Sequence, residues 1–290
     1  MWKTLKVAPA ELNLDNTLFI GQVFNWVKVN EEYVGCIGDQ LVRLKPTRQG
    51  LEYIGNKAAI NTYFNLDVSI APKYAEWSSD SLFKQVAPNK PGVRILKQPL
   101  FECIICFICS QNSHIKRITK NIESLRQHYG RRISNVHDQE WHAFPTPEQL
   151  SAATELELRN LGLGYRAKYI ALTCAYIVER GSKRWVDHVH SLPYEEAKDE
   201  LMQLAGVGPK VADCIALFAL NFFSIVPIDV HMWRIAKDHY LRQNLSLNDR
   251  TYKQAAEAFE KQFGKYAGWA HSILYAGSIA KQPLKRKRAD

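Results

Sequence analysis

The segment "LMQLAGVGPKVADCIALFALNFFSIVPIDVHMWRIA", residues 201–236, decides the fold of this 290-residue chain. Two glycines, Gly206 and Gly208, form a short turn, and Pro209 opens the next helix, because proline lacks the N–H that the first helical turn leaves unpaired. Apolar residues then recur at helical spacing. The pattern predicts two helices joined by a tight hairpin, whose uncovered backbone N–H groups can hold a phosphate.

Lys210 stands in the first turn of the second helix, where the positive end of the helix dipole disfavours an ammonium group. It is either a surface lysine with a buried stem or a reactive amine. Partial burial and the dipole are both expected to lower its pKa from the usual value of ~10.4, as a nucleophilic amine requires. Cys214 follows at i+4, either as a wall of the same pocket or as a small core residue.

A second polar cluster follows at Asp229 and His231. Asp229 is placed as the N-cap of the next helix, which is the default role of an aspartate there. A capping carboxylate also stays ionised, and such an anion can stabilise a cationic, oxocarbenium-like sugar or help to transfer a proton. His231 is either a phosphate donor or a packed surface histidine.

The composition indicates a globular protein with an anionic partner. The net charge of +9 and the isoelectric point near 9.2 favour a polyanion, with nucleic acid and anionic lipid both open. No apolar segment is long enough to cross a bilayer, since residues 214–228 are interrupted by Asn221 and Pro227. The first residues lack the features of a transit peptide or a signal peptide.

The six cysteines show no secreted disulfide pattern, so a reducing compartment is expected. Cys103, Cys106 and Cys109 recur every three residues, which is typical of a cluster ligand set or of one helix face. No fourth thiol is nearby, and isoleucine and phenylalanine lie between them. A buried helix is therefore predicted, with no redox cofactor or catalytic metal.

The order of patterns predicts an α+β fold. Residues 17–55 are rich in β-forming residues with turns between them, which indicates an antiparallel sheet of hairpins, and the helical spacing begins near Pro99. The proline- and lysine-rich stretch at 86–99 is the expected junction, giving a β-rich domain over 1–92 and a helical domain over 93–290. Helices are predicted after it at 147–161, 164–180, 194–204, 209–222, 230–240, 249–263 and 266–280.

A second Gly-x-Gly turn lies in "LGLGYRAKYI", residues 161–170, and like the first it precedes a basic helix start. Each turn alone is typical of an ordinary helix–helix connection, whereas two copies in a basic chain favour binding to a DNA backbone. A lysine amine, a fixed carboxylate and a phosphate-binding hairpin together suggest attack on a sugar carbon of DNA.

These residues carry a family resemblance. The sequence resembles the helix-hairpin-helix DNA glycosylases, and within them the eukaryotic 8-oxoguanine DNA glycosylase/AP lyases. The resemblance covers nearly the whole chain in family order, through "FIGQVFNW", "ICSQNSHIKRI", "LGLGYRAKYI", "LAGVGPKVADCIALFAL" with "VPIDVHMWRIA", and "YAGWAHSILYAG". The C-terminal iron–sulfur loop of another branch is not matched.

The resemblance implies a bifunctional enzyme that removes 8-oxoguanine, and related oxidised purines such as formamidopyrimidines, from opposite cytosine. Lys210 would be the nucleophile that forms a Schiff base with the sugar and allows β-elimination 3′ to the site, and Asp229 would stabilise the charged intermediate. The backbone carbonyl of Gly21 would test for the proton at N7 of the oxidised base. Cys214, Phe218, His271 and Tyr275 would complete the base pocket.

Two of these residues differ from the family pattern. His271 stands where a glutamine reads the base edge, and Tyr275 stands where a phenylalanine stacks on the base. Neutral histidine offers one donor and one acceptor, as the amide does, but in another geometry. The substitution predicts a sharper pH dependence of base recognition, with 8-oxoguanine still the main substrate.

The same resemblance implies how duplex DNA would be held. Asn112 would fill the gap left by the extruded base and Tyr165 would wedge beside it, while Arg117 and Arg166 would read the opposite cytosine. Without the resemblance, these residues would be a helix cap, a core aromatic and solvated charges. Phosphates would be held by Gly206, Gly208 and His231, with a structural ion at the backbone carbonyls of Met202, Leu204 and Val207.

The expected partner is double-stranded DNA that contains oxidised guanine, bound by a monomer without a membrane. The terminal "PLKRKRAD" is typical of a nuclear-import signal, a nonspecific DNA arm or a solubilising end, so a nuclear location is expected, with a mitochondrial pool left open. Two other functions stay open: a glycosylase of different lesion specificity and a noncatalytic DNA-binding protein.

Overall fold

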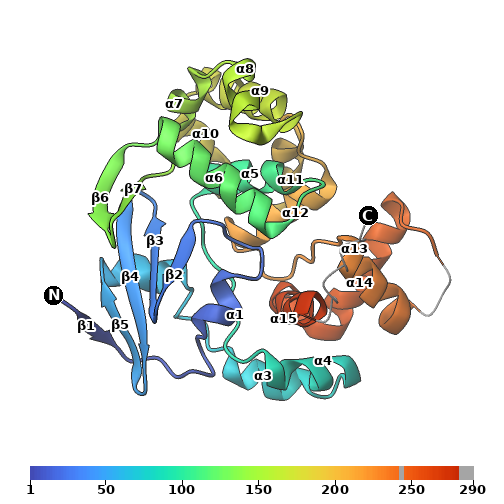
Figure 1. Ribbon diagram of the computed structural model, residues 1–290. Helices are drawn as coiled ribbons and strands as arrows, with labels where there is room; N and C mark the ends of the chain where they lie inside the picture. Colours follow the sequence, from blue (N-terminus) through green and yellow to red (C-terminus); the bar gives the residue numbers. More distant parts are fainter. Residues whose placement is uncertain (242–244, 281–290) are drawn as a thin grey trace, which may run out of the picture.

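The computed structural model describes residues 1–241 and 245–280 of the chain. An antiparallel sheet stands at one side of the molecule, and helices form the remainder in two groups, one around α5–α12 and one around α3, α4 and α13–α15 (Figure 1). The α+β prediction is confirmed. The C-terminal "PLKRKRAD" lies outside the described residues.

The sheet has the strand order β1-β5-β4-β3-β2, and neighbouring strands are antiparallel. Asn30 and Gly38 adopt positive φ angles of 56° and 61° in the tight turns between strands. The strands are β1 (Lys3–Leu5), β2 (Trp26–Val29), β3 (Glu32–Ile37), β4 (Gln40–Thr47) and β5 (Gly50–Ile54).

The extended chain predicted from residue 17 is wrong up to Trp26. Residues Leu14–Leu18 form the short helix α1, because the side chain of Asn13 caps it by accepting from Asn16 N at 2.9 Å. The segment that follows is a loop held by buried side chains. Its Asn25 amide donates to the Cys36 carbonyl at 3.0 Å.

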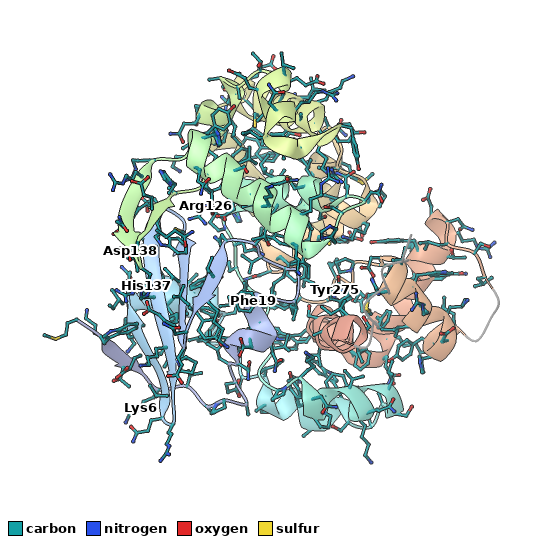
Figure 2. The ribbon with its side chains drawn as sticks, in the orientation of Figure 1. Lys6, Phe19, Arg126, His137, Asp138 and Tyr275 are labelled. Carbon is teal, nitrogen blue, oxygen red and sulfur yellow. The ribbon has the colours of Figure 1, made fainter. Side chains whose placement is uncertain are left out.

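A second hairpin was not predicted. Strands β6 (Arg132–Val136) and β7 (Gln139–His142) pair antiparallel around His137 and Asp138, whose φ angles are 54° and 58°. Figure 2 shows Arg126 where α6 meets the sheet. Its guanidinium donates to the His142 carbonyl and, at 2.8 Å, to the Cys36 sulfur, and so ties this hairpin to β3.

After Pro99 the helices largely follow the prediction, although α10 was missed and the predicted helix at 147–161 is divided into α7, α8 and a π-turn. Helices α2, α3 and α4, in the part expected to be rich in strands, were not predicted. The helices are α2 (Lys57–Tyr63), α3 (Ala71–Trp77), α4 (Ser81–Val86), α5 (Leu100–Ser110), α6 (Ile115–Tyr129), α7 (Pro147–Ser151), α8 (Glu155–Leu158), α9 (Arg166–Glu179), α10 (Ser182–Ser191), α11 (Tyr194–Met202), α12 (Pro209–Phe218), α13 (Val230–Ile235), α14 (Asp249–Phe263) and α15 (Ala267–Ala280). Shorter turns are η1 (Ala87–Asn89), η2 (Arg159–Leu163), η3 (Ala236–Leu241) and η4 (Gly264–Tyr266).

Helix α5 forms the centre of the helical body, packed against α6, α9 and α12. The predicted buried helix is confirmed, since Cys103, Cys106 and Cys109 are all buried as free thiols. Burial raises the pKa of Cys109 to about 12, so this thiol stays protonated and unreactive.

The larger apolar core crosses from the N-terminal segment into the helical body. Ile20 and Phe24 belong to it, and α4 packs against α15. The loop that contains Gly21 thereby packs against the helical body, where a Cβ at Gly21 would lie 3.5 Å from Ile115 of α6 and 4.0 Å from Tyr275 of α15. Within the described ranges, every helix is too short or too polar to cross a bilayer.

Candidate active site and nucleic-acid interface

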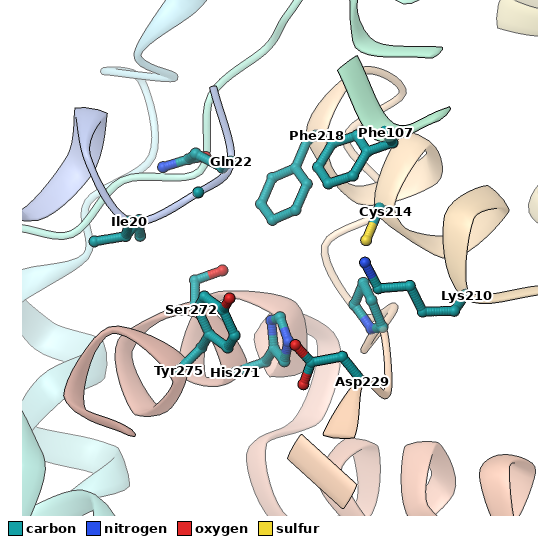
Figure 3. A pocket seen from close by; sticks show the side chains of 12 residues that line it. Ile20, Gln22, Phe107, Lys210, Cys214, Phe218, Asp229, His271, Ser272 and Tyr275 are labelled. Carbon is teal, nitrogen blue, oxygen red and sulfur yellow. The ribbon is translucent and has the colours of Figure 1, made fainter. Parts of the chain in front are cut away.

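A pocket opens where α5, α12, α13 and α15 meet the loop that precedes β2 (Figure 3). It encloses about 410 Å³ of empty space, part of it open to solvent. Every residue that the sequence assigned to catalysis or base binding lies on its wall. The lining residues are Ile20, Gly21, Gln22, Phe107, Lys210, Cys214, Phe218, Pro227, Asp229, His271, Ser272 and Tyr275.

Lys210 reaches the pocket from the first turn of α12, which Pro209 opens, as predicted. Gly208 is the N-cap of this helix. Its amino group points toward the sulfur of Cys214 (Figure 3). It also lies 5.5 Å from the centroid of the Phe107 ring, which stacks on Phe218 at 5.6 Å with an interplanar angle of 7°. The aromatic pair gives the amine a partly dry wall.

The pKa of Lys210 is not lowered, contrary to the expectation. Desolvation by burial lowers it, but the interactions of the amine with the Cys214 sulfur and the Asp229 carboxyl group outweigh that effect, and the net pKa is raised. Burial raises the pKa of Cys214 itself to about 11, so it is a neutral thiol near pH 7. The resting amine is therefore an ammonium, and Asp229 lines the same pocket.

Asp229 is the N-cap of α13, as predicted. Its Oδ1 accepts from the backbone N–H groups of His231 and Met232, both at 2.9 Å. Because the cap uses one oxygen, Oδ2 remains available to the pocket. The cap fixes the carboxylate in the pocket wall while leaving it able to face a positive charge.

Three residues of α15 present one face to the pocket: His271, Ser272 and Tyr275. The His271 and Tyr275 rings stack at 6.2 Å with an interplanar angle of 21°. Burial lowers the pKa of His271 to about 4, so its ring is neutral at physiological pH. The sharper pH dependence of base recognition expected from this histidine stays a prediction.

Gly21 has a φ of +90°, a conformation that favours glycine. Its position depends on the next residue, Gln22, which was not predicted from the sequence. The Gln22 amide donates to the carbonyls of Thr17 and Arg94 at 2.8 Å and accepts from Leu96 N at 3.1 Å. No sequence signal marks Gln22, because its partners lie mainly some 70 residues away along the chain.

Asp213 was also missed, and it fixes the helix that carries Lys210. Buried on α12, it accepts from the hydroxyls of Tyr194 at 2.8 Å and Tyr252 at 2.6 Å. Lys198 forms an ion pair with it at 2.8 Å. These contacts join α12 to α11 and α14. In the sequence, Asp213 is a charged residue at a position of α12 that faces the core, and this could have indicated a buried partner.

The residues predicted to hold DNA gather around the end of α5. Asn112 is exposed with a φ of +46°, and Tyr165 is 44% exposed. The loop is joined to the hairpin by Gln111, whose amide donates to the Gly206 carbonyl at 2.8 Å, and Arg117 approaches the Gly162 carbonyl at 3.5 Å. Both Gly-x-Gly turns thus border one surface with the predicted wedge residues.

His231 lies apart from that loop. It is partly buried on α13, and its ring packs edge-on against Tyr275 with centroids 5.8 Å apart. This contact places it beside the pocket that Tyr275 lines.

Arg166 is placed differently from the exposed reader that the sequence suggested. It is 2% exposed, and its guanidinium donates to the carbonyls of Gln111 and Asn112 at 3.0 and 3.1 Å. It also lies 4.7 Å from the Tyr165 ring centroid. In this conformation Arg166 shapes the loop, and it would have to leave these carbonyls to contact an opposite base.

The hairpin has the expected backbone. Gly206 has a φ of +80°, and a Cβ there would lie 2.5 Å from Cδ2 of Tyr169, whereas nothing lies within 4 Å of a Cβ at Gly208. No cluster of His, Cys, Asp or Glu suited to a metal occurs in the described ranges. An ion at Met202, Leu204 and Val207 would rest on carbonyl oxygens alone, and that of Leu204 already accepts from Val207 N at 3.0 Å.

Comparison with known families agrees with this geometry. A model for the N-terminal domain of 8-oxoguanine DNA glycosylase matches residues 4–104, and a model for the HhH-GPD superfamily of base excision DNA repair proteins matches residues 105–264. The chain belongs to the HhH-GPD superfamily. The boundary between the two matches falls inside α5.

Curated members of the superfamily resemble the chain over nearly its full length. The N-glycosylase/DNA lyase OGG1 of Arabidopsis thaliana is 35% identical over 97% of this chain and 81% of its own. The N-glycosylase/DNA lyase of Saccharomyces cerevisiae is 34% identical over 99% of this chain and 90% of its own.

A solved HhH-GPD structure has the same fold. It is the 8-oxoguanine glycosylase/lyase of Clostridium acetobutylicum, bound to double-stranded DNA with cytosine opposite 8-oxoguanine. The two chains are 28% identical with a TM-score of 0.85, and the match covers 93% of this chain and 92% of that one.

Proposed function

We propose that this chain is a bifunctional DNA repair enzyme that excises 8-oxoguanine, and related oxidised purines such as formamidopyrimidines, opposite cytosine and then cleaves the strand. One observation carries the proposal: Lys210, Cys214 and Asp229 face one pocket together with Gly21, beside a hairpin suited to a phosphate. A noncatalytic DNA-binding protein would need none of these three side chains.

The first step is displacement of the base by Lys210. Its amine attacks C1′ of an extruded nucleotide, and the glycosidic bond breaks with its electron pair going to the base nitrogen. Because the pKa of Lys210 is raised, the amine holds a proton that it must lose, and the departing base is a suitable acceptor for it. Asp229 stabilises the positive charge that develops on the sugar.

The second step is lyase cleavage. The sugar ring opens to give a Schiff base between Nζ of Lys210 and C1′. A water molecule then takes a proton from C2′, the C3′–O bond breaks, and the 3′ phosphate departs with the electron pair. The iminium accepts electron density during this elimination, so the same lysine serves both steps.

Borohydride trapping tests this chemistry directly. Wild-type protein and a duplex with 8-oxoguanine opposite cytosine are expected to give a covalent adduct, and Lys210→Gln is expected to give none. Lys261→Gln, the same change at an exposed lysine of α14, should trap like the wild type. Trapping that survives Lys210→Gln would place the nucleophile elsewhere.

We further propose that the protein acts in the nucleus, where duplex DNA of this kind is repaired. The basic residues of "PLKRKRAD" support import, and charge-neutralising substitution of Lys285, Arg286, Lys287 and Arg288 tests it. A fluorescent fusion that stays nuclear after this substitution would show that the tail is not the signal.

A further inference from the structure

Two buried side chains join the loop that contains Gly21 to helix α5. Asn25 ends this loop, directly before β2, and Glu102 lies in the first turn of α5. They are 5% and 4% exposed. Nδ2 of Asn25 donates to Oε1 of Glu102 at 2.8 Å and to the Cys36 carbonyl at 3.0 Å. The amide therefore uses both of its hydrogens.

The two elements that this contact joins supply different parts of the pocket wall. Gly21 lies on the loop, four residues before Asn25. Phe107 lies on α5, five residues after Glu102, and the Lys210 amine is 5.5 Å from its ring centroid. A change in how the loop rests on α5 would therefore move Gly21 relative to the amine.

The oxygen of the same amide is buried and unpaired. Among the described residues, Oδ1 of Asn25 has no hydrogen-bond partner, which is unfavourable for a buried acceptor. An ionised Glu102 only accepts hydrogen bonds and cannot supply the missing hydrogen, whereas a protonated carboxyl group has one O–H donor. The contact is therefore fully satisfied only when Glu102 is a neutral acid.

The charge on Glu102 depends on groups from four elements. Arg126 of α6 supplies a positive charge that favours the carboxylate, but desolvation by burial outweighs it and raises the pKa of Glu102 to about 7. Burial also raises the pKa of each of the other titratable groups that interact with Glu102, so they are neutral near pH 7. They are Cys36 of β3, Tyr63 of α2, and Cys103 and Cys106 of α5.

We propose that Glu102 is a positioning residue that acts as a neutral acid, with its O–H donating to Oδ1 of Asn25 and its other oxygen accepting from Nδ2. The two side chains then form a closed pair that holds the Gly21 loop on α5. The last torsions of glutamate and asparagine side chains have broad minima, so both groups can turn into one plane. The effect on excision rests on the proposed function, whereas the pair itself does not.

Loss of the proton replaces one hydrogen bond of the pair by a repulsion. The carboxylate of Glu102 would then set a lone pair against Oδ1 of Asn25, while Arg126 would attract it. The Gly21 loop is therefore held less firmly as the pH rises through about 7. Glu102→Gln is the informative variant, because a second amide can keep both hydrogen bonds to Asn25 but cannot titrate.

Urea unfolding tests the pair without DNA. The folded pKa of Glu102, about 7, lies above its usual value of 4.5, so between these values the folded chain binds a proton that the unfolded chain lacks. The stability that this proton gives is complete below pH 4.5 and is lost as the pH rises to 7. From pH 5 to pH 7 the unfolding constant of the wild type, divided by that of Glu102→Gln, should therefore rise by up to about tenfold for each pH unit.

A ratio that stays constant over this range would overturn the inference, because Glu102 would then be ionised throughout. Glu179→Gln is the matched control. The side chain of Glu179 at the end of α9 is 81% exposed, so the same ratio for this variant should not change with pH.

Single-turnover excision of 8-oxoguanine tests the positioning role. Between pH 6 and pH 8.5 the rate of the wild type, divided by that of Glu102→Gln, should fall about three- to tenfold, the loss of one hydrogen bond. The titration of Lys210 cancels in this ratio, because both proteins contain it. Glu102→Met, which can form neither hydrogen bond, should be slower than Glu102→Gln at both pH values.

A constant rate ratio, or equal rates of Glu102→Gln and Glu102→Met, would show that the pair does not position the loop. A wild type that neither excises nor traps 8-oxoguanine would instead refute the proposed function. The unfolding ratio would still decide in that case whether Glu102 is a neutral acid.

Discussion

The charge on Lys210 depends on two neighbours with different roles. Cys214 is a neutral thiol at physiological pH, so the lasting negative charge near the amine is the carboxylate of Asp229. That carboxylate is also bonded into the start of α13. One residue therefore combines a structural role with an electrostatic one, and a suitable substitution can separate them.

Asp229→Asn makes that separation, because asparagine is as good an N-cap as aspartate but carries no charge. The excision rate is expected to fall about 100- to 1000-fold, while the free energy of unfolding changes by less than about 0.5 kcal/mol. Single-turnover kinetics and urea unfolding measure the two quantities. Asp229→Ala should lose the rate and also about 1 kcal/mol of stability. A stable, fully active Asp229→Asn variant would remove the carboxylate from the mechanism.

His271 makes stability depend on pH. Its folded pKa of about 4 lies below the value of ~6.5 for an exposed histidine, so between these values the unfolded chain binds a proton that the folded chain does not. The contribution of the neutral His271 ring to the free energy of unfolding is complete above pH 6.5 and is lost as the pH falls toward 4. Between pH 7 and pH 5 the wild type should lose about 2 kcal/mol more unfolding free energy than His271→Gln. Equal losses in urea titrations would indicate an exposed ring.

At the scale of the element, the hairpin between α11 and α12 has two glycines with different requirements. Gly206 needs its positive φ and has no room for a Cβ beside Tyr169, whereas Gly208 has free space around it. The first glycine is required by the fold, and the second leaves a helix N-terminus uncovered.

Alanine substitutions should distinguish these requirements. Gly206→Ala is expected to destabilise the protein by about 1–3 kcal/mol. Gly208→Ala should change stability by less than about 1 kcal/mol but weaken duplex binding roughly tenfold, because its methyl group covers the N–H groups that a phosphate would approach. Thermal unfolding and anisotropy at fixed salt provide the readouts. Normal DNA binding by Gly208→Ala would move the phosphate site away from the hairpin.

The elements that were predicted well from the sequence are determined by residues nearby in the chain. The α12 start at Gly208 and Pro209 and the Asp229 cap follow from local backbone chemistry. The misses depend on distant partners. The β6–β7 hairpin is held by Arg126, and the side chain of Arg166 is buried by a loop 54 residues away. A basic residue in a basic chain gives no sign that it will be buried.

Only those site residues that match motifs of the family could be predicted from the sequence. Residues on the pocket wall that match family positions were placed correctly, but their protonation was not, because the pKa of Lys210 depends on charges brought together only by folding. Gln22, Asp213 and Ser272 were missed for the same reason. Their partners or their pocket exist only in three dimensions.

At the scale of the whole molecule, Arg94 joins the N-terminal segment to the helical body. It is 1% exposed and donates to the carbonyls of Phe64 and Val68 at 3.0 and 2.8 Å. Its guanidinium carbon lies 5.1 Å from the ring centroid of Trp269 on α15, and it pairs with Glu11 at 3.2 Å. Desolvation lowers the pKa of Arg94 to about 10, so it remains charged at neutral pH.

Arg94→Met should therefore destabilise the entire protein by about 3–5 kcal/mol, since it leaves buried carbonyls and Glu11 unpaired. Arg159→Met is the control, because Arg159 forms an exposed i, i+4 pair with Glu155 and should cost less than about 1 kcal/mol. Urea unfolding followed by tryptophan fluorescence gives both values. If Arg94→Met and Arg159→Met were equally stable, Arg94 would not stabilise the contact between the N-terminal segment and the helical body.

The amide of Gln111 that reaches the Gly206 carbonyl has a mechanical consequence. The loop expected to probe the base stack and the turn expected to hold the backbone share this link, so neither can shift far while the other stays in place. A duplex that resists distortion would pull on both at once, and a weakened base pair would relieve both. Contact with the base stack and contact with the backbone would then be linked through this one hydrogen bond.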